Sequence, residues 1–344
     1  MPTLTYVTTK TKLTLKWLSI SLVYLSILLV VIRIGFAIKE RLLPTAPPPP
    51  TVTFGKLSPL SFPNSATDKN LTYSIDTISG FLPSVPPQVK VYGMKKTKPQ
   101  FLALDIARQK VASAGFRSSE ARLSENWYRW TDQGYPSREI TFNIFSNDFT
   151  ISSPFLSDPI AHLFANNFSN QKSAINTAQN LLSATASFPN DLDLKLTKTL
   201  YYSITEDGSL NPETNISSAQ VIRIDFFQKS IDDLPIYYPN ASTSTINVLV
   251  ANLQNQPLII GANYNHQAIS TTAHTYPIKS AVQAFVELRD QKAYIVSYFG
   301  ENTNISIRNV FLGYYIGHER QDFLMPIVVS VSYTHLTLPT ILRV

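Results

Sequence analysis

Residues 17–38 read WLSISLVYLSILLVVIRIGFAI, and this run divides the chain into a membrane segment and a folded body. A helix rises about 1.5 Å per residue, so the run would extend roughly 33 Å, enough to cross the hydrocarbon core of a bilayer. Arg33 is its only charged residue and lies near one end, where a long side chain can reach the interface. The run predicts a single transmembrane helix with the lipid bilayer as its partner, rather than a buried core helix or a cleaved signal peptide.

Composition bounds the rest of the chain. It has 344 residues, 44% hydrophobic and 15% charged, which is enough for a large folded body and excludes disorder over most of its length. The absence of cysteine excludes disulfides, thiolate metal sites and cysteine nucleophiles. The net charge of +6 comes from residues beside the hydrophobic run and from Arg343, so we expect no nucleic-acid partner for the nearly neutral body.

The orientation of the membrane helix is inferred from the residues after it, because cations are nearly balanced on its two sides. Prolines at 44 and 47–50 predict a stiff stalk over residues 39–66, and the body beyond is rich in Ser, Thr, Asn and Tyr. We therefore expect a short cytoplasmic tail, 1–16, and an extracytoplasmic body on the plasma membrane of a bacterial type of cell.

The C-terminal segment has a different origin from the body. Residues 331–340, VSYTHLTLPT, resemble the translation of an adapter used in sequencing libraries. We expect residues 330–344 to be an artefact of this kind and the last native unit to be truncated near Val329.

Three amphipathic helices are expected in the body. Residues 97–114 place Leu104, Ala107, Val111 and Ala114 on one face, with Thr97 as the N-cap and a glycine at the end. Similar stripes predict helices over 174–186 and 277–290.

Each expected helix is preceded or followed by short strands, which sets the fold class. Short strands that follow one another in sequence favour antiparallel sheets with helices on one face. The expected fold class is therefore α+β, built of tandem units that each hold one helix and a small antiparallel sheet. The units are 67–155, 156–270 and 271–329. The expected strands are 71–78, 88–92, 127–131, 138–145, 148–153, 196–204, 219–227, 245–251, 257–264, 293–299, 305–315 and 323–329.

Two segments carry a family resemblance. Residues 219–237, AQVIRIDFFQKSIDDLPIY, are similar to the strand, turn and strand of PepSY-like modules, and residues 276–288, YPIKSAVQAFVEL, are similar to the helix that comes next in those modules. Together with the membrane helix and the stalk, this layout resembles the bacterial YycI/YycH-type regulators. The resemblance implies regulation of a membrane partner or a peptidase, without catalysis by the chain itself.

Catalytic motifs give little support for an enzyme. Ser169 and Lys172 match the S-x-x-K motif of penicillin-binding proteins, but the companion K-T-G and S-D-N motifs are missing. The sequence has no G-x-S-x-G, G-x-G-x-x-G, Walker or H-E-x-x-H motif.

Other titratable groups are expected to be structural. His266 and His274 lie eight residues apart without a neighbouring acid in sequence, so we expect surface or strand histidines rather than metal ligands. The adjacent acids are expected to be turn formers. These pairs are Glu206 with Asp207 and Asp232 with Asp233. No catalytic, metal or cofactor-binding residue is assigned, and no cofactor is expected.

Aromatic residues supply the candidate binding surface. The aromatic pairs are candidates for lining a peptide or glycan groove, against the commoner arrangement in which one member of each pair packs in the core and the other covers an exposed sheet face. The candidates are Phe227, Tyr237, Tyr238, Tyr314 and Tyr315.

The expected function is a non-catalytic, membrane-anchored, extracytoplasmic binding and regulatory module of the cell envelope, with a membrane or envelope protein as partner. The alternative is an envelope hydrolase or transpeptidase, which a cleft holding His162, Ser169 and Lys172 together would favour.

Overall fold

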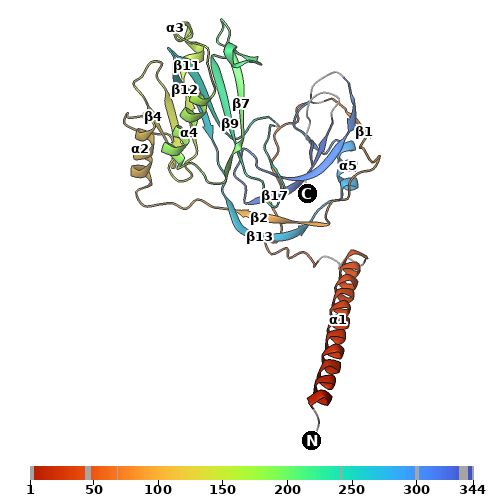
Figure 1. Ribbon diagram of the computed structural model, residues 1–344. Coiled ribbons are helices and arrows are strands. Elements are labelled where there is room, and N and C mark those ends of the chain that lie inside the picture. Colours follow the sequence, from red (N-terminus) through yellow and green to blue (C-terminus); the bar gives the residue numbers. More distant parts are fainter. Residues whose placement is uncertain are drawn as a thin grey trace. The chain divides into compact units, whose positions relative to one another are not determined.

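The computed structural model describes residues 4–42, 48–67, 69–240, 242–298, 302–332 and 340–342, which form two units, Met1–Pro49 and Pro50–Val344. The first unit contains helix α1 (Leu4–Leu42), drawn in red in Figure 1. Its stretch Leu15–Gly35 is long and apolar enough to cross a membrane, and none of it is buried against protein. An N-terminal apolar helix is therefore confirmed; a signal sequence would meet the same criteria of length and composition.

The second unit is built on a nine-stranded antiparallel sheet. Its strands are, in spatial order, β3 (Ala121–Arg122), β4 (Trp127–Thr131), β5 (Glu139–Asn143), β6 (Phe149–Ser152), β12 (Gln256–Tyr264), β11 (Ile246–Leu253), β9 (Val221–Gln228), β7 (Leu192–Ile204) and β8 (Leu210–Glu213). Strands from two of the expected units, 67–155 and 156–270, thus join through the pairing of β6 with β12.

Helices cover both faces of this sheet. On one face α2 (Ala103–Ser113) and α4 (Lys172–Ala186) contribute Val111, Ala178 and Leu182 to a core with the inward side chains of the strands. Period-two alternation in β9 sends Val221 to the opposite face, where it packs with Phe155 of the 3-10 helix η1 (Pro154–Ser157) and with short helix α3 (Pro159–Leu163).

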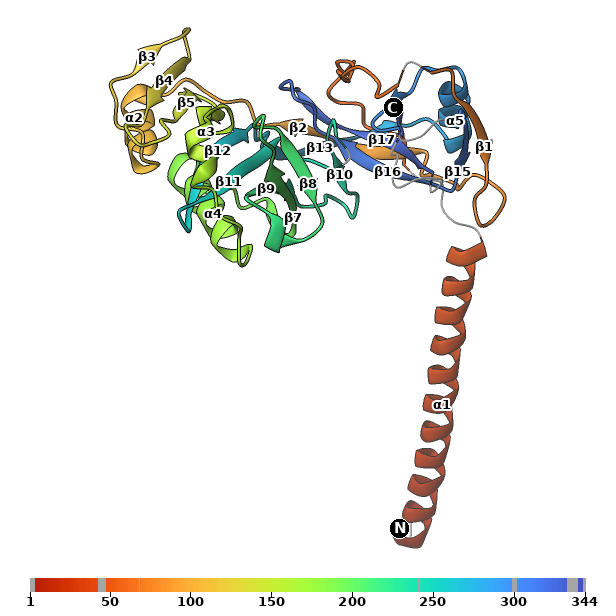
Figure 2. The same ribbon diagram turned by 90° about the horizontal axis from the view of Figure 1, so that it is seen from above.

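A second, seven-stranded sheet combines the two ends of the unit. The path β10 (Ile236–Tyr237), β16 (Asn309–Tyr315), β17 (Phe323–Val331), β18 (Thr340–Leu342), β14 (Tyr294–Ile295) is joined by β2 (Gln88–Met94), which pairs with β17 and with β13 (Ile269–Pro277). Figures 1 and 2 show β2 and β13 side by side next to β17.

Helix α5 (Ala281–Arg289) packs Ala284 and Leu288 onto this layer, and a two-stranded ribbon, β1 (Thr72–Ile75) with β15 (Asn304–Ile307), completes the same core. Ser280 caps α5 with a capping box to Gln283. The β1–β15 and β10–β16 pairs are parallel, whereas the other strand pairs in the described residues are antiparallel.

The α+β prediction and the antiparallel sheets are confirmed. The expected N-cap Thr97 is wrong, because the chain stays irregular to Leu102, which adopts φ 65° immediately before α2. Strand β13 was not expected, because its sequence ISTTAHTYP lacks a clear hydrophobic alternation. Strand β17 continues through Ser330 and Val331 into the segment assigned to the adapter, and 333–339 and 343–344 lie outside the described residues.

Candidate functional site

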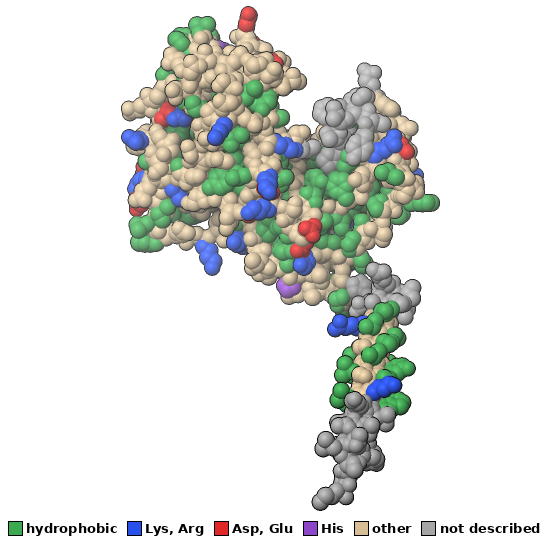
Figure 3. All heavy atoms as spheres, viewed as in Figure 1, with side chains coloured by type: hydrophobic (Ala, Val, Ile, Leu, Met, Phe, Trp, Pro, Cys, Tyr) green, Lys and Arg blue, Asp and Glu red, His purple; other side chains and the backbone are tan. Residues whose placement is uncertain are grey.

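A cleft lies where elements of the two large sheets meet. Its volume is about 370 Å³, within the range of small-ligand sites. We call it the junction cleft, and its lining residues are Lys95, Lys96, Thr97, Ser146, Asn147, Ala186, Pro189, Asn190, Asp191, Tyr264, His266, Ala268, Ile269 and Arg320. Figure 3 draws the face of the body that is seen in Figure 1, with Lys and Arg side chains spread over it, several of them near its middle.

A histidine and a carboxylate form the polar centre of the junction cleft. His266 Nε2 lies 2.9 Å from Asp191 Oδ1, and Gln228 Nε2 donates to Asp191 Oδ2 at 2.9 Å. Burial tends to raise the pKa of Asp191, but the hydrogen bond and charge of His266, together with the bond from Gln228, outweigh it and hold the pKa below its usual range. The carboxylate therefore stays ionised and fixes the His266 ring.

Arg320 brings a guanidinium into the junction cleft from the β16–β17 connection. Its Nη2 lies 2.6 Å from Asp148 Oδ2, and Asp148 is 9% exposed. Gln267, only 2% exposed, donates to the carbonyls of Gly317 and Glu319 and accepts from the Gln321 amide. These bonds hold the cationic connection against the nine-stranded sheet.

Lysines give the junction cleft its charge. Lys95 and Lys96 are exposed at its rim, and Lys96 pairs with Asp322 at 2.9 Å. Within the described part of the chain Lys95 makes no ion pair. Nearby, Lys110 Nζ donates to Asn147 Oδ1 at 2.7 Å, and burial lowers the pKa of Lys110. Of the three cations that line the cleft, Arg320 is paired with Asp148 and Lys96 with Asp322, so Lys95 is the lining cation without an ion pair in the described chain.

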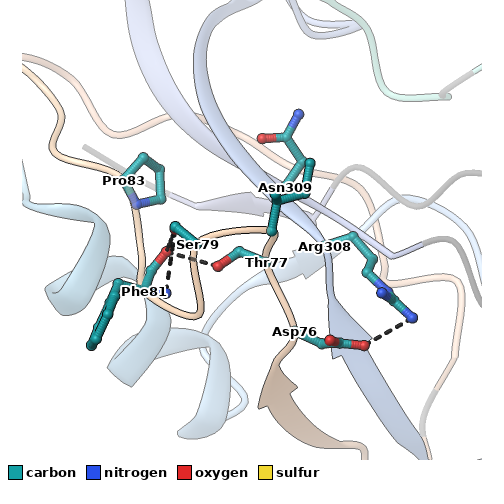
Figure 4. A pocket seen from close by; sticks show the side chains of 8 residues that line it. Asp76, Thr77, Ser79, Phe81, Pro83, Arg308 and Asn309 are labelled. Carbon is teal, nitrogen blue, oxygen red and sulfur yellow. Dashed lines mark hydrogen bonds and ion pairs between the residues drawn. The ribbon is translucent and has the colours of Figure 1, made fainter.

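A second hollow, of about 840 Å³, lies where both strands of the parallel β1–β15 ribbon end. We call it the loop hollow. Figure 4 shows Arg308 directed toward Asp76, at 2.8 Å, and the Thr77 and Ser79 side chains directed toward the backbone of Phe81. The hollow combines one ion pair with exposed apolar side chains.

The five aromatic residues expected to form a binding surface are mostly core residues. Tyr314 and Tyr315 are fully buried, because β16 is covered on both faces, and Tyr238 is 3% exposed with its hydroxyl against Gln228. Tyr237 and Phe227 are partly buried. Burial raises the pKa of Tyr237 to about 12. A continuous aromatic surface is therefore not formed by this set. One buried member per pair describes Tyr237 with Tyr238, whereas Tyr314 and Tyr315 are both buried.

The residues of the enzyme hypothesis do not form a shared site. Ser169 and Lys172 are exposed at the start of α4, and His162 lies in α3 with a buried Nε2 that has no hydrogen-bond partner in the described chain. None of the three lines the junction cleft or the loop hollow.

The two histidines expected to be structural have separate partners. His274 in β13 lies 3.5 Å from Thr51 Oγ1 and stacks edge-on against Phe54. His266 instead has an acid beside it, Asp191, which lies 75 residues away in sequence and was not anticipated.

The expected acidic turns are present. Asp232 and Asp233 both have positive φ, and Asp207 accepts hydrogen bonds from Thr205 and Ser209 in a turn. No group of three or more His, Asp or Glu residues with metal-binding geometry occurs among the residues that the structure describes.

Comparison with known proteins gives few relatives. No protein-family model matches the sequence, and no curated protein matches it. A solved structure of an uncharacterized protein from Eubacterium rectale is similar with a TM-score of 0.37 and 12% sequence identity, over 80% of this chain and 88% of that chain.

Proposed function

We propose that this chain is a membrane-anchored binding and regulatory module of the bacterial cell envelope, with its body on the extracytoplasmic side of the plasma membrane. Helix α1 would serve as a single-pass signal anchor, which the apolar stretch Leu15–Gly35 supports. The resemblance of the layout to YycI/YycH-type and PepSY-like proteins supports a regulatory rather than a catalytic role.

The ligand that fits the junction cleft is an acidic segment of a membrane or envelope protein. The observation that carries this proposal is the position of Lys95, an exposed lining cation without an ion pair in the described residues, beside the paired cations Lys96 and Arg320. Such a surface attracts carboxylates and speeds their encounter. Asn147 adds a side-chain amide beside the cations.

Binding can be tested with a fluorescent oligo-glutamate peptide and the full chain in lipid nanodiscs. Reversal of the rim charges, Lys95→Glu with Lys96→Glu, is expected to weaken the peptide's affinity by about tenfold or more. Lys195→Glu, an exposed lysine on β7 outside the cleft, is the matched control and should leave affinity nearly unchanged. An equal loss in the control, or equal binding of an oligo-glutamine peptide, would contradict the proposed site.

Orientation is tested separately by adding protease to intact cells or spheroplasts. Degradation of the body under these conditions supports an extracytoplasmic location. Protection until the membrane is broken would place the body in the cytoplasm and overturn this part of the proposal.

A second candidate, an envelope hydrolase or transpeptidase, is favoured by one observation. The His266–Asp191 couple at 2.9 Å has the geometry of a base held by an orienting carboxylate. Incubation of the chain with peptidoglycan fragments would reveal new products by chromatography. Products that disappear with His266→Gln but persist with His274→Gln would support the enzyme over the binding module.

A further inference from the structure

A turn at the rim of the loop hollow holds two large apolar side chains in solvent. Ile78 is fully exposed and Phe81 is 78% exposed. Removing side chains of this size from water is favourable, roughly in proportion to the apolar area that is buried. Single exposed apolar residues are ordinary, but two on one short turn form a protruding apolar tip, residues 78–81.

The apolar tip is braced by its own hydrogen bonds. Thr77 Oγ1 and Ser79 Oγ donate to the Phe81 carbonyl at 2.8 and 3.0 Å, and the Gly80 amide donates to the Thr77 carbonyl at 2.9 Å. Gly80 adopts φ 74°, a conformation that glycine tolerates best. Because the tip is already ordered, a contact through it loses little conformational entropy.

The base of the tip is fixed to the body. Leu82 and Val85 pack against the core cluster that contains Ala284 and Leu288 of α5. On the other side, the Asp76–Arg308 pair joins the ends of β1 and β15, with both side chains about half exposed (Figure 4). The body therefore presents the tip outward, with a cationic side chain close behind it.

We infer that the apolar tip inserts into the interfacial region of the same bilayer that holds α1. The inference rests on the proposed membrane anchoring. Eight peptide steps join Leu42, the last residue of α1, to Pro50, the first residue of the body. An extended chain reaches at most about 3.5 Å per residue, so this tether spans no more than about 28 Å.

The tether explains how so small a tip can act. Two partly inserted side chains bind a membrane only weakly from free solution, as single lipid anchors do. A short tether makes the contact intramolecular and raises its effective concentration into the millimolar range. The interface takes up apolar side chains below the headgroups, and the Asp76–Arg308 ion pair behind the tip can stay in water at the level of the headgroups.

A bilayer fits this feature better than a protein partner does. A stable protein interface buries at least about 1,000 Å² with matched shape. Here the apolar atoms of Ile78 and Phe81 belong to one narrow turn that also lines the loop hollow, and exposed side chains on such a turn suit a fluid surface that yields around them.

The test uses the lack of cysteine, which gives any single-cysteine variant one labelling site. Phe81→Cys is labelled with an environment-sensitive fluorophore in the full chain, reconstituted into vesicles of phosphatidylcholine and phosphatidylglycerol. We expect a blue-shifted emission and strong quenching by lipids spin-labelled on the acyl chain.

Matched controls are Phe101→Cys and Leu163→Cys, which replace apolar residues 94% and 81% exposed. They lie next to α2 and in α3, and both views place these helices at the other end of the body from β1 (Figures 1 and 2). Their labels should emit as in water. A label at Ile78→Cys should lose its lipid quenching when Phe81→Asp is added.

Three results would overturn the inference: an aqueous spectrum at position 81, equal lipid quenching at the controls, or shielding of position 81 from water without lipid quenching. The last result would mean that protein covers the tip. Alkaline extraction of the same vesicles tests the anchor itself. Release of the chain contradicts the proposed function, whereas a retained chain with an aqueous label at position 81 contradicts only the tip.

Discussion

Arg320 and Asp148 lie 172 residues apart in sequence and are joined by two hydrogen bonds, from Arg320 Nη2 and Nε to Asp148 Oδ2 at 2.6 and 3.1 Å. The pair connects the β16–β17 connection to the β5–β6 turn, and so ties the second sheet to the first. Its guanidinium also lines the junction cleft. One side chain thus serves both the assembly of the body and the charge of the candidate site.

Replacing Arg320 should destabilise the body. In Arg320→Ala the Asp148 side chain, 13% exposed, keeps Ser146 as a partner but loses its cation, and we expect the free energy of unfolding to fall by about 1–3 kcal/mol. Urea denaturation measures the change. Arg129→Ala breaks an exposed pair with Glu139 at 3.5 Å and should cost no more than about 1 kcal/mol. Equal losses in the two variants would mean that the junction pair has no special role.

Acid should remove the stabilisation that the ionised Asp191 side chain gives to the folded protein. Its pKa in the folded protein is depressed, so its stabilisation is complete above the ordinary aspartate pKa of about 4 and is lost as the pH falls through the folded value. The stability difference between the natural protein and Asp191→Asn should be about the same from neutral pH down to about pH 4 and should narrow below that pH. Denaturation across this range tests it, with exposed Glu125→Gln as control. A difference that stays constant into strong acid would contradict the His266 interaction.

Gly313 is required by the neighbouring parallel strand. A Cβ atom there would lie 2.6 Å from the Tyr237 ring and 3.0 Å from the Pro235 carbonyl, so Gly313→Ala must displace β10 or the ring. We expect a loss of about 1–3 kcal/mol, seen as a lower melting temperature. Gly261→Ala, also in a strand, meets nothing closer than 3.7 Å and serves as the matched control. A similar loss at both glycines would point to backbone propensity instead of the Tyr237 contact.

The contribution of the α5 N-cap to the stability of the protein should be measurable with a single substitution. Ser280 Oγ accepts a hydrogen bond from the backbone N–H of Gln283 at 3.2 Å. We expect Ser280→Ala to lower the free energy of unfolding by about 1 kcal/mol. Ser113→Ala changes an exposed serine at the C-terminal end of α2, and it should change the free energy of unfolding by no more than about 0.5 kcal/mol. Thermal unfolding of both variants decides whether the capping box contributes to stability.

Two truncations distinguish the end of β17 from the C-terminal residues beyond it. Deleting residues 330–344 removes Ser330, which is 3% exposed, and the pairing of Ser330 and Val331 with Val310 and Asn309. Deleting 333–344 retains that pairing. We expect the longer deletion to melt several degrees lower than the shorter one, the scale of about one or more kcal/mol in a domain of this size. Identical melting temperatures would show that residues 330–332 add nothing.

The sequence predicts the helices and central strands because their signals are local. Val111 and Leu182 belong to stripes that a 3.6-residue period reveals. The start of α2 was misplaced because Leu102 adopts a positive φ, which no capping pattern announces. Strand β13 has weak local signals and is defined by pairing with β2, whose residues lie about 180 positions earlier. Pairing over such a separation cannot be derived from periodicity.

The candidate site could not be predicted for the same reason, because its residues come together only through contacts between distant parts of the sequence. Asp191 comes directly before β7 and His266 shortly after β12, two strands that β9 and β11 separate in the sheet, and Lys95 joins them only through the β2–β13 pairing. For the aromatic pairs, the residues are adjacent in sequence, and it is their burial that the sequence does not reveal. Adjacent tyrosines in a strand point to opposite faces, and the sequence cannot tell that both faces of β16 are covered, so that Tyr314 and Tyr315 are both buried.

The central place of β2 affects the biosynthesis of the chain. The strands of the nine-stranded sheet all lie within residues 121–264 and can pair as soon as that stretch is made, but β2 must wait for Ile269–Pro277 and Phe323–Val331. At about 5–20 residues per second, translation takes roughly 10–40 s to travel from β2 to β13, the first of its two partners to be made. During that time Val91, Tyr92 and Met94, all buried in the finished protein, belong to a strand without partners. In a nascent chain of this design, β2 is an unpaired apolar strand until its partners are made, which is the kind of strand that aggregates most readily.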